Sequence, residues 1–333
     1  MAKDRVAVLL TESSRARVMP EESLRRLSNV AELREAAGPP PEWDLAELLD
    51  GAVACLTGWG TPPLDNDILA AHPELRLVAH TAGSIRALVP ADAIGNRIRV
   101  CQAAALIADA VAEFAVLQML EGLRRLHDAD RRLRAGADWR EVVDAIPGHL
   151  LGAQTVGVVG ASRVGRAVIR LVQAFGSEVI VHDPYLAADD ASALGVDAAD
   201  LDTIMRRSDV VTLHAPFIPA TANMIGSKEL GLMRDGALLI NCARAGLIDP
   251  DALLAELKAG RLWAALDVFP AEPLAPDSEW RQVPNAIISP HLAGRTVETY
   301  HRQGDAIVAD VERFLRGEPL RHEIDPSTAA SLA

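Results

Sequence analysis

The sequence contains little cysteine, and this scarcity excludes two kinds of small-protein scaffold. Only three of the 333 residues are cysteines, Cys55, Cys101 and Cys242, and they are widely spaced with no CxxC pair. A disulfide framework needs several paired cysteines, and a structural zinc site needs clustered ligands. We therefore expect no disulfide and no metal site. Three unpaired thiols are typical of a reducing cytoplasm.

Positive charge and long apolar runs are also scarce. Lys and Arg total 33 against 46 for Asp and Glu, so the net charge of −13 repels nucleic acid. The richest apolar stretch, Ala103 to Leu120, contains Asp109 and Glu113. The first apolar run, Val6 to Leu10, is too short for a signal peptide or a membrane span. We expect a soluble, cytoplasmic protein that binds neither nucleic acid nor a membrane.

The sequence instead shows a regular alternation of short apolar runs and longer helix-like segments. Half of its residues are hydrophobic, and the length favours two domains. This alternation is the pattern of βαβ units around parallel sheets. Helical periodicity predicts helices over residues 22–36, 107–135 and 296–316, whereas residues 324–333 have the composition of a loop. After Pro147, a block of about six strands predicts a doubly wound sheet.

A run of arginines lies in the predicted helix of residues 107–135. It consists of Arg124, Arg125, Arg131, Arg132 and Arg134. No aromatic residue is interleaved to stack on bases. We interpret the run as a solvated or interface end of the helix.

One strand-to-helix turn has the character of a dinucleotide-binding loop. The predicted strand that starts at Thr155 leads into Gly160, Ser162 and Gly165 and then into a helical segment. Backbone N–H groups at such a helix start can hold a pyrophosphate. Ser162 stands where GxGxxG has its middle glycine, so it either loosens the approach of the phosphates or adds a hydroxyl donor. Taken alone, such a turn is as often packing as binding.

The next strand adds a signal for the type of dinucleotide. It ends at Asp183, where a carboxylate can accept hydrogen bonds from the ribose hydroxyls of NAD and repels the 2′-phosphate of NADP. The prediction is NAD. The alternative is that Asp183 only begins the turn that continues with Pro184.

Three later apolar strands each end in a polar or charged group, where open α/β sheets form their ligand crevice. INCARAGLID delivers Arg244, LDVFPAEP delivers Asp267 and Glu272, and AIISPHLAG delivers His291. A guanidinium can bind a carboxylate in bidentate fashion, and an imidazole can exchange a proton with a carbonyl oxygen. A carboxylate beside the imidazole would fix its tautomer and favour its protonated form. Taken singly, Arg244 could form a surface ion pair, His291 could be a structural histidine and Glu272 could be a solvated loop residue.

Together with LHAPFIPAT, these motifs resemble the NAD-dependent D-isomer-specific 2-hydroxyacid dehydrogenases over roughly residues 82–315. The resemblance implies an α/β protein of two doubly wound parallel-sheet domains. A Rossmann NAD domain, residues 104–292, would be inserted into a flavodoxin-like substrate domain formed by residues 1–103 and 293–333, with the active site in the cleft. It also implies that Arg244, Glu272 and His291 are catalytic, and that the protein is a homodimer joined through the long helix and neighbouring elements.

The same resemblance implies the binding residues. The NAD site would be formed by Gly160, Ser162, Arg163, Val164, Gly165, Asp183, His214, Ala215, Pro216, Thr221, Cys242, Ala243, Asp267 and Gly294, with Asp267 near the nicotinamide carboxamide and Cys242 as packing that faces the cofactor. The substrate carboxylate would be held by backbone N–H groups of Ala82, Gly83 and Ser84, together with Arg244.

Several residues depart from the family pattern or leave the substrate open. Ser162 replaces a glycine, Ala245 replaces the glycine after the catalytic arginine, and Ile107 stands where an asparagine is expected. Ala245 would be strained if its backbone needed a positive φ. His80 and Arg86 flank the Ala82–Ser84 loop, where they either add positive charge or are solvated loop residues.

The leading expectation is an oxidoreductase, similar to glyoxylate or hydroxypyruvate reductases, that interconverts a small 2-oxo acid and its D-2-hydroxy acid with NAD(H). Two alternatives stay open. One is an NAD-sensing, corepressor-like binding protein with little catalysis. The other is a dehydrogenase of a phosphorylated or phosphonate hydroxy acid, which would need additional cations near the substrate.

Overall fold

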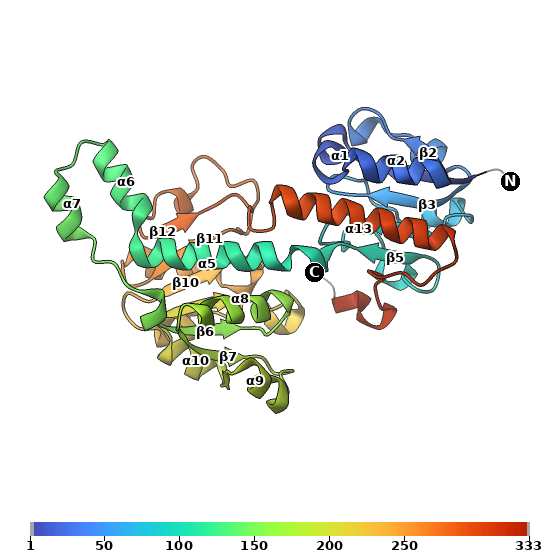
Figure 1. Cartoon of the computed structure of the whole chain (residues 1–333). Helices are drawn as coiled ribbons and strands as arrows, with labels where there is room; N and C mark the ends of the chain where they lie inside the picture. Colours follow the sequence, from blue (N-terminus) through green and yellow to red (C-terminus); the bar gives the residue numbers. More distant parts are fainter. Residues whose placement is uncertain (1–2, 332–333) are drawn as a thin grey trace. The chain divides into compact units, whose positions relative to one another are not determined.

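The computed structural model describes residues 3–331 and divides into two compact units. Unit 1 contains the described residues up to Ile107 and those from Arg295 onward, and unit 2 is Ala108–Gly294. The chain thus leaves unit 1, builds unit 2 and returns to unit 1 (Figure 1). The described residues contain no helix that is long and apolar enough to cross a membrane.

Unit 1 is built on a parallel sheet with the strand order β2-β1-β3-β4-β5. This is the flavodoxin-like order, which confirms the predicted fold of this part. The strands are β1 (Asp4–Leu9), β2 (Ala31–Glu35), β3 (Ala52–Thr57), β4 (Leu77–His80) and β5 (Arg99–Gln102). The helices are α1 (Glu12–Val18), α2 (Glu21–Val30), α3 (Leu45–Leu49), α4 (Asn66–Ala71) and α13 (Val297–Leu315), with 3₁₀ turns η1 (Pro40–Glu42), η2 (Ala91–Ala93), η3 (Ala104–Ile107) and η8 (Pro326–Ser331).

The sheet of unit 1 is buried on both faces, which explains the uninterrupted apolar run of its first strand. Val6 and Val8 pack with residues of α13, whereas Ala7 and Leu9 pack with residues of α3 and α4. Helix α13 also meets the end of α1 at Gly304. A Cβ at Gly304 would lie 1.5 Å from the carbonyl oxygen of Val18, so only glycine permits this approach.

Unit 2 is a parallel sheet with the strand order β12-β11-β10-β9-β6-β7-β8. The strands are β6 (Thr155–Val159), β7 (Glu178–His182), β8 (Asp197–Ala198), β9 (Val210–Leu213), β10 (Leu238–Asn241), β11 (Trp263–Leu266) and β12 (Ala286–Ile288). The helices are α5 (Ala108–Arg124), α6 (Leu126–Arg134), α7 (Trp139–Ala145), α8 (Arg163–Ala174), α9 (Ala188–Leu194), α10 (Leu201–Arg207), α11 (Ser227–Leu232) and α12 (Pro250–Lys258), with 3₁₀ turns η4 (Leu151–Ala153), η5 (Pro219–Thr221), η6 (Ala245–Leu247) and η7 (Glu279–Arg281).

This order is the Rossmann order extended by one strand at the β12 edge, which confirms the predicted fold of unit 2. The sheet has seven strands where the sequence predicted about six. The strand that was missed is β8, which is only two residues long and too short to show periodicity. Helix α5 packs on α8, β10 and β11, while α10, α11 and α12 contribute to the core cluster of the sheet. The direction of winding reverses between β6 and β9, which is where such sheets bind ligands.

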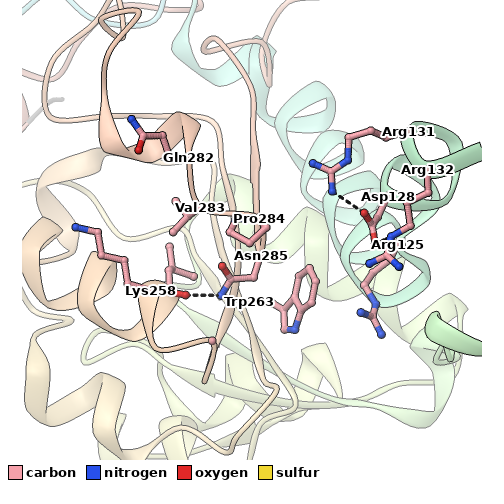
Figure 2. Close-up of a pocket in the computed structure, with 12 residues that line it drawn as sticks. Arg125, Asp128, Arg131, Arg132, Lys258, Trp263, Gln282, Val283, Pro284 and Asn285 are labelled. Carbon is pink, nitrogen blue, oxygen red and sulfur yellow. Dashed lines mark hydrogen bonds and ion pairs between the residues drawn. The ribbon is translucent and has the colours of Figure 1, made fainter. Parts of the chain in front are cut away.

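The single long helix predicted over residues 107–135 is wrong, because the helix breaks at Arg125. Helix α5 ends at Arg124 and α6 begins at Leu126, and the residue between them is left-handed with φ 49° and ψ 40°. The guanidinium carbon of Arg125 lies 4.9 Å from the centre of the Trp263 ring, a cation–π contact with the first residue of β11 (Figure 2). A tertiary contact therefore accompanies a break that helical periodicity cannot indicate.

Two further predictions of local structure need correction. The segment 22–36 is not one helix, because α2 ends at Val30 and the chain continues as strand β2. Strand β2 is an edge strand, and edges accept the charged residues that gave this segment its helix-like pattern. The loop predicted for residues 324–333 contains the 3₁₀ turn Pro326–Ser331.

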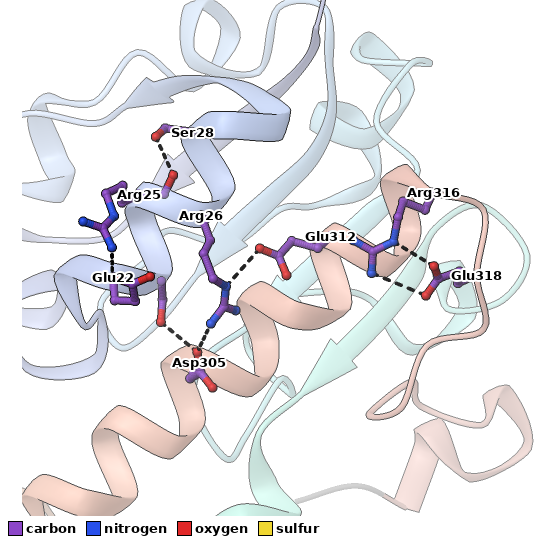
Figure 3. A network of polar contacts seen from close by, with 9 residues as sticks. Glu22, Arg25, Arg26, Ser28, Asp305, Glu312, Arg316 and Glu318 are labelled. Carbon is purple, nitrogen blue, oxygen red and sulfur yellow. Dashed lines mark hydrogen bonds and ion pairs between the residues drawn. The ribbon is translucent and has the colours of Figure 1, made fainter.

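Polar contacts connect the returning helix α13 to α2 (Figure 3). The Arg26 guanidinium donates to Asp305 at 2.7 Å and to Glu312 at 3.2 Å, and the Ser23 hydroxyl donates to Asp305 at 2.9 Å. Asp305 and Glu312 are two helical turns apart, so both face α2. The carboxylate of Asp305 raises the pKa of Arg26. These contacts hold the C-terminal helix on the N-terminal part of the chain.

Candidate active site

The predicted dinucleotide loop lies between β6 and α8 and is shaped by close backbone packing. Gly160 has φ +98°, and a Cβ at this position would lie 2.6 Å from the backbone nitrogen of Ala215. A side chain at Gly160 is excluded both by its backbone conformation and by the chain that leaves β9. The loop is therefore held at the point where the sheet reverses its winding.

Ser162 is accommodated without strain as the N-cap of α8. Its φ of −62° is ordinary, and its hydroxyl oxygen accepts a hydrogen bond from Gly165 N at 3.3 Å. Two alternatives were open for Ser162, a looser approach of the phosphates or an added hydroxyl donor. This geometry favours the second, because the hydroxyl proton remains available to a phosphate oxygen. The next residue, Arg163, is exposed at the start of the helix, where an anion is favoured.

Replacing Ser162 by alanine should destabilise the protein by about 1 kcal/mol, because the helix loses its capping acceptor. Replacement by glycine should cost only a few tenths of a kcal/mol. The matched control is Thr296→Ala, which removes the N-cap of α13 in unit 1. Denaturant titration and NADH binding should show similar stability losses for both alanine variants, but weaker NADH binding only for Ser162→Ala. Equal NADH affinity in both variants would contradict a cofactor contact by Ser162.

Asp183 follows β7 and faces this loop. Its Oδ2 accepts from Ala161 N at 2.7 Å, and its Oδ1 accepts from Tyr185 N at 2.8 Å. Asp183 therefore begins a turn, and its carboxylate also lies beside the glycine loop. A negative charge there opposes a 2′-phosphate and suits the ribose hydroxyls of NAD.

The segment after β9 forms the other wall of the loop. His214 is buried, its Nε2 lies 2.9 Å from Thr212 Oγ1, and its Nδ1 has no hydrogen-bond partner among the described residues. Thr221 Oγ1 donates to the Pro216 carbonyl at 2.6 Å and accepts from Ile218 N, which fixes the turn after this strand. An unpaired buried nitrogen beside the glycine loop fits a site that is completed by a polar ligand.

Arg244 follows β10 and is held by its own backbone. Asn241, which is almost fully buried, donates from Nδ2 to the Arg244 carbonyl at 2.9 Å and accepts from Ala243 N at 3.0 Å. The Arg244 side chain donates to the Ala243 carbonyl at 2.8 Å. Burial lowers the pKa of Arg244 and the Glu272 carboxylate opposes this shift, but a guanidinium stays charged at any physiological pH. Ala245 begins a 3₁₀ turn with a negative φ, so the strain considered for it does not arise.

His291 and Glu272 form a pair at the ends of the two neighbouring strands. Nδ1 of His291 lies 2.8 Å from Glu272 Oε2, and the other carboxylate oxygen accepts from Phe269 N at 2.9 Å. Burial raises the pKa of Glu272, but the hydrogen bonds from His291 and Phe269 outweigh it and hold this pKa below its ordinary value. A carboxylate can only accept here, so Nδ1 carries a proton and Nε2 is left for another partner.

Asp267 organises the chain around this pair. Its carboxylate is fully buried and accepts from Ser289 Oγ at 2.6 Å, Leu292 N at 2.8 Å and Ala293 N at 2.8 Å. His291, between these groups, has a left-handed backbone with φ +54°. Such strain in a residue other than glycine is commonly found at functional sites. Burial and the charge of Asp267 raise the pKa of the neighbouring Cys242 thiol, so this cysteine stays protonated.

The structure brings most predicted site residues of unit 2 to the carboxyl edge of one sheet. β10, β11 and β12 are adjacent, and they are followed by Arg244, Glu272 and His291 respectively. Sequence patterns did not indicate the supporting roles of Asn241, Ser289 and Gln118. The Nε2 of Gln118 donates to Ser289 Oγ at 3.3 Å. A polar residue within the apolar periodicity of α5 was the available signal for Gln118.

The predicted substrate loop lies in unit 1, after β4. Ala82 is buried and Gly83 and Ser84 are half-buried. Ile107 packs beside this loop, with its Cδ1 3.2 Å from where a Cβ on Gly83 would stand. Arg86 is exposed, whereas His80 is buried, with Nδ1 3.0 Å from Thr57 Oγ1. Burial lowers the pKa of His80 to about 4, so this residue adds no positive charge at neutral pH. Because it is buried, it is not a solvated loop residue either.

Two buried histidines should make the protein sensitive to acid. Burial lowers the pKa of His80 to about 4 and that of His214 to about 3, from an ordinary 6.5. Between these values the unfolded chain binds more protons than the folded chain, so the free energy of unfolding falls as the pH falls below 6.5. By pH 4 each histidine should remove about 3 kcal/mol.

Denaturant titrations between pH 7 and 4.5 check this effect. His80→Asn retains a polar atom for Thr57 but removes the titrating imidazole. The slope of the free energy of unfolding against pH should therefore decrease by the equivalent of almost one bound proton. An unchanged slope in this variant would contradict the buried neutral state of His80.

Comparison with known proteins connects this geometry to a family. A family model for the D-isomer specific 2-hydroxyacid dehydrogenase, NAD binding domain, matches residues 116–293. A glyoxylate reductase of Korarchaeum cryptofilum is 31% identical over 308 residues, which cover 91% of this chain and 92% of that protein. A D-3-phosphoglycerate dehydrogenase of Methanocaldococcus jannaschii is 31% identical over 94% of this chain, but this chain spans only 58% of that protein.

Solved structures show the same architecture. A protein of Thermus thermophilus is similar with a TM-score of 0.82 and 28% identity, over 96% of this chain and 100% of that one. A D-mandelate dehydrogenase of Rhodotorula graminis has a TM-score of 0.84 at 23% identity, over 97% of this chain and 98% of that one, which shows the fold. Because the family model matches more than half of the chain and a relative is similar over nine-tenths of it, this chain belongs to the D-isomer specific 2-hydroxyacid dehydrogenases, NAD-dependent oxidoreductases that act on a CH–OH group.

Proposed function

We propose that this protein interconverts a small 2-oxo acid and its D-2-hydroxy acid, with Arg244 binding the substrate and His291 and Glu272 acting as the acid–base pair. The observation that carries this proposal is the hydrogen bond between His291 Nδ1 and Glu272, formed at the sheet edge that also carries Arg244. It leaves Nε2 of a histidine available for proton transfer at the sheet edge that also carries a guanidinium.

Each residue has a distinct role in the reduction. NADH, when bound, supplies the hydride. The Arg244 guanidinium binds the substrate carboxylate and polarises the neighbouring carbonyl. His291 donates the Nε2 proton to the carbonyl oxygen as it becomes a hydroxyl. Glu272 stays ionised and stabilises the imidazolium before the transfer, and backbone N–H groups of Ala82, Gly83 and Ser84 hold the carboxylate.

The proposed NAD site collects the residues that follow the strands of unit 2. The loop and the start of α8 contribute Gly160, Ser162, Arg163, Val164 and Gly165, and the segments after the later strands contribute Asp183, His214, Ala215, Pro216, Thr221, Cys242, Ala243, Asp267 and Gly294. All of them lie in unit 2 and come after the carboxyl ends of its parallel strands. This is the edge where dinucleotides bind in Rossmann sheets.

The test is oxidation of NADH and NADPH, followed at 340 nm, against a panel of 2-oxo acids. The panel contains glyoxylate, hydroxypyruvate, pyruvate, branched and aromatic 2-oxo acids, phosphonopyruvate and 3-phosphohydroxypyruvate. We expect turnover with NADH on a 2-oxo acid whose side chain is small and uncharged, because Ile107 presents an apolar group beside the Gly83 loop. Absence of turnover on every acid, with NADH shown to bind, would overturn the proposal.

A phosphorylated hydroxy acid is the second candidate substrate, favoured by the similarity to D-3-phosphoglycerate dehydrogenases. Such a substrate needs cations beyond Arg244. Arg86, which is exposed beside the proposed carboxylate loop of unit 1, offers one, whereas His80 is neutral. Turnover on 3-phosphohydroxypyruvate that is lost in Arg86→Gln would establish this candidate. A third candidate, the NAD-sensing corepressor, predicts NADH-dependent capture of protein partners and no turnover at all.

We also propose that the protein is a homodimer joined through α5, α6 and α7. Large apolar side chains are exposed on these helices and on the segment that follows α7. These exposed residues are Leu117, Leu126, Leu133, Trp139, Val143 and Leu150. A concentrated set of exposed apolar residues is typical of a protein–protein interface. Trp139 is 69% exposed and Leu150 is 71% exposed, which makes them the best sites to test.

The double variant Trp139→Glu, Leu150→Glu should convert the dimer to a monomer, because two charges would be buried at the contact. The matched control is Tyr185→Glu, which changes an exposed aromatic residue outside these helices. Sedimentation velocity measures the mass of each variant. A monomeric parent protein, or a double variant that stays dimeric, would contradict the proposed interface.

A cytoplasmic location is the remaining proposal. Cys55, Cys101 and Cys242 are all free and buried, and burial raises the pKa of Cys55 to about 12. Unpaired thiols of this kind suit a reducing compartment. The test is the location of a tagged chain after cell fractionation, where recovery outside the cytoplasm would contradict it.

A further inference from the structure

A cavity lies in unit 2 at the sheet edge opposite the proposed catalytic residues. It has a volume of about 520 Å³, within the range of small-molecule sites. It lies at the amino ends of β11 and β12, between α6 on one side and the end of α12 on the other (Figure 2). Its walls are formed by Arg125, Asp128, Arg131, Arg132, Leu257, Lys258, Gly260, Trp263, Gln282, Val283, Pro284 and Asn285.

The cavity is cationic although the chain as a whole carries a net charge of −13. Four of its residues are cations, and Asp128 is the only carboxylate among those that line it. Asp128 is buried and is shared by two guanidiniums, with Arg131 Nη2 at 2.6 Å and Arg132 Nε at 3.1 Å. One carboxylate between two guanidiniums leaves a positive charge uncompensated. Lys258 pairs at 2.6 Å with Glu279, which does not line the cavity.

Arg125 is the least compensated of these cations. It forms no ion pair with a carboxylate among the described residues, and its guanidinium is held over the Trp263 ring at 4.9 Å. The left-handed backbone of Arg125 is unfavourable for a residue other than glycine, by about 1 kcal/mol or more. A strained, half-buried arginine fixed at the wall of a cavity is a feature of binding sites rather than of a solvated helix end.

We propose that this cavity binds a small polyanion of metabolite size, with two or more carboxylate or phosphate groups. Arginine guanidiniums suit both groups, because each presents a planar fork of donors. Trp263, Val283 and Pro284 provide apolar surface for the carbon skeleton between the charged groups. Three arginines of the run in residues 124–134 line this cavity, and they are Arg125, Arg131 and Arg132.

The cavity is separate from the proposed NAD site. Strand β11 begins with Trp263 at the cavity and ends before Asp267, and Asn285 at the cavity precedes β12, which leads to His291. Both strands therefore run from the cavity to the catalytic edge, and occupation of one site does not require residues of the other.

Isothermal titration calorimetry with citrate, and separately with pyrophosphate, tests the proposal on the full chain at low ionic strength. We expect saturable one-site binding of at least one probe, unchanged by saturating NADH and weakened by added salt. Arg125→Asn should weaken the affinity at least fivefold, because asparagine tolerates the left-handed backbone but has no charge. Arg125→Lys should keep part of the affinity, because an ammonium retains the charge but not the planar fork of donors.

The matched control is Arg134→Gln on the same helix. Arg134 is exposed, pairs with Asp130 at 2.8 Å and does not line the cavity, so this variant should bind the probes like the parent protein. No saturable binding up to 10 mM, on the order of the weakest metabolite sites, would overturn the proposal. So would equal weakening by Arg125→Asn and Arg134→Gln, or competition by NADH, which would place the probe at the cofactor site. Retained NADH binding by Arg125→Asn shows that this variant is folded.

Discussion

Replacing His291 by asparagine should lower kcat for 2-oxo acid reduction by about 10³-fold, because the variant loses its proton donor. Asparagine accepts the left-handed backbone of this position, so the loop around Asp267 should be preserved. The affinity for NADH, measured by fluorescence titration, should change by less than about threefold, because His291 is not one of the proposed NAD-binding residues. Unchanged turnover would contradict the assignment of His291 as the acid.

Glu272→Gln is the companion variant that separates proton transfer from positioning. Glutamine keeps a hydrogen bond to Nδ1 but removes the charge that stabilises the imidazolium. Hydrogen bonds hold the pKa of Glu272 below its ordinary value, so its carboxylate is ionised at neutral pH. The reduction rate of Glu272→Gln should therefore fall, but by less than that of His291→Asn, which loses the proton donor itself. An unchanged reduction rate would contradict a role for this charge.

Replacing Arg244 by alanine should lower kcat/KM by about 10³-fold, because the guanidinium binds the carboxylate and also polarises the reacting carbonyl. Arg244→Lys should recover only a small part of the loss, since an ammonium cannot form the bidentate contact. Steady-state kinetics over a range of 2-oxo acid concentrations provide the measurement. The backbone of this loop should stay in place, because Asn241 holds the carbonyl of Arg244 and not its side chain.

The control for Arg244 is Arg234→Ala, which removes a surface ion pair with Asp209 in the same unit. Its kcat/KM should equal that of the parent protein. If Arg244→Ala raised KM and left kcat unchanged, the guanidinium would contribute to binding alone, and polarisation of the carbonyl would be excluded.

The fold was largely predictable because its pattern is local. Apolar strands buried on both faces are visible as short aliphatic runs, and glycine at a strand-to-helix turn marks the start of α8. The errors lie where tertiary contacts overrule local pattern. Edge strand β2 was included in a helix, and β8 is too short to carry a period. The break at Arg125 accompanies a contact with Trp263, more than a hundred residues away in the sequence.

In the candidate site, too, local sequence indicated the residues and tertiary structure set their arrangement. Sequence placed Arg244, Glu272 and His291 after apolar strands, but sequence cannot state that these strands are neighbours in the sheet. The order β12-β11-β10 decides this, and it sets the 2.8 Å contact between His291 and Glu272. The protonation state of His80 was also outside the reach of sequence, because it depends on burial.

The sequence alone determined the class of the fold and the family, because periodicity and motif spacing are properties of the chain itself, and it predicted which side chains are chemically active. Only the tertiary structure decided which of these groups meet, which are neutral and where charge accumulates. Distances between strand ends and the loss of solvent around a side chain exist only after folding. The cationic cavity beside Trp263 is the clearest case, since its arginines and its aromatic wall come from distant segments.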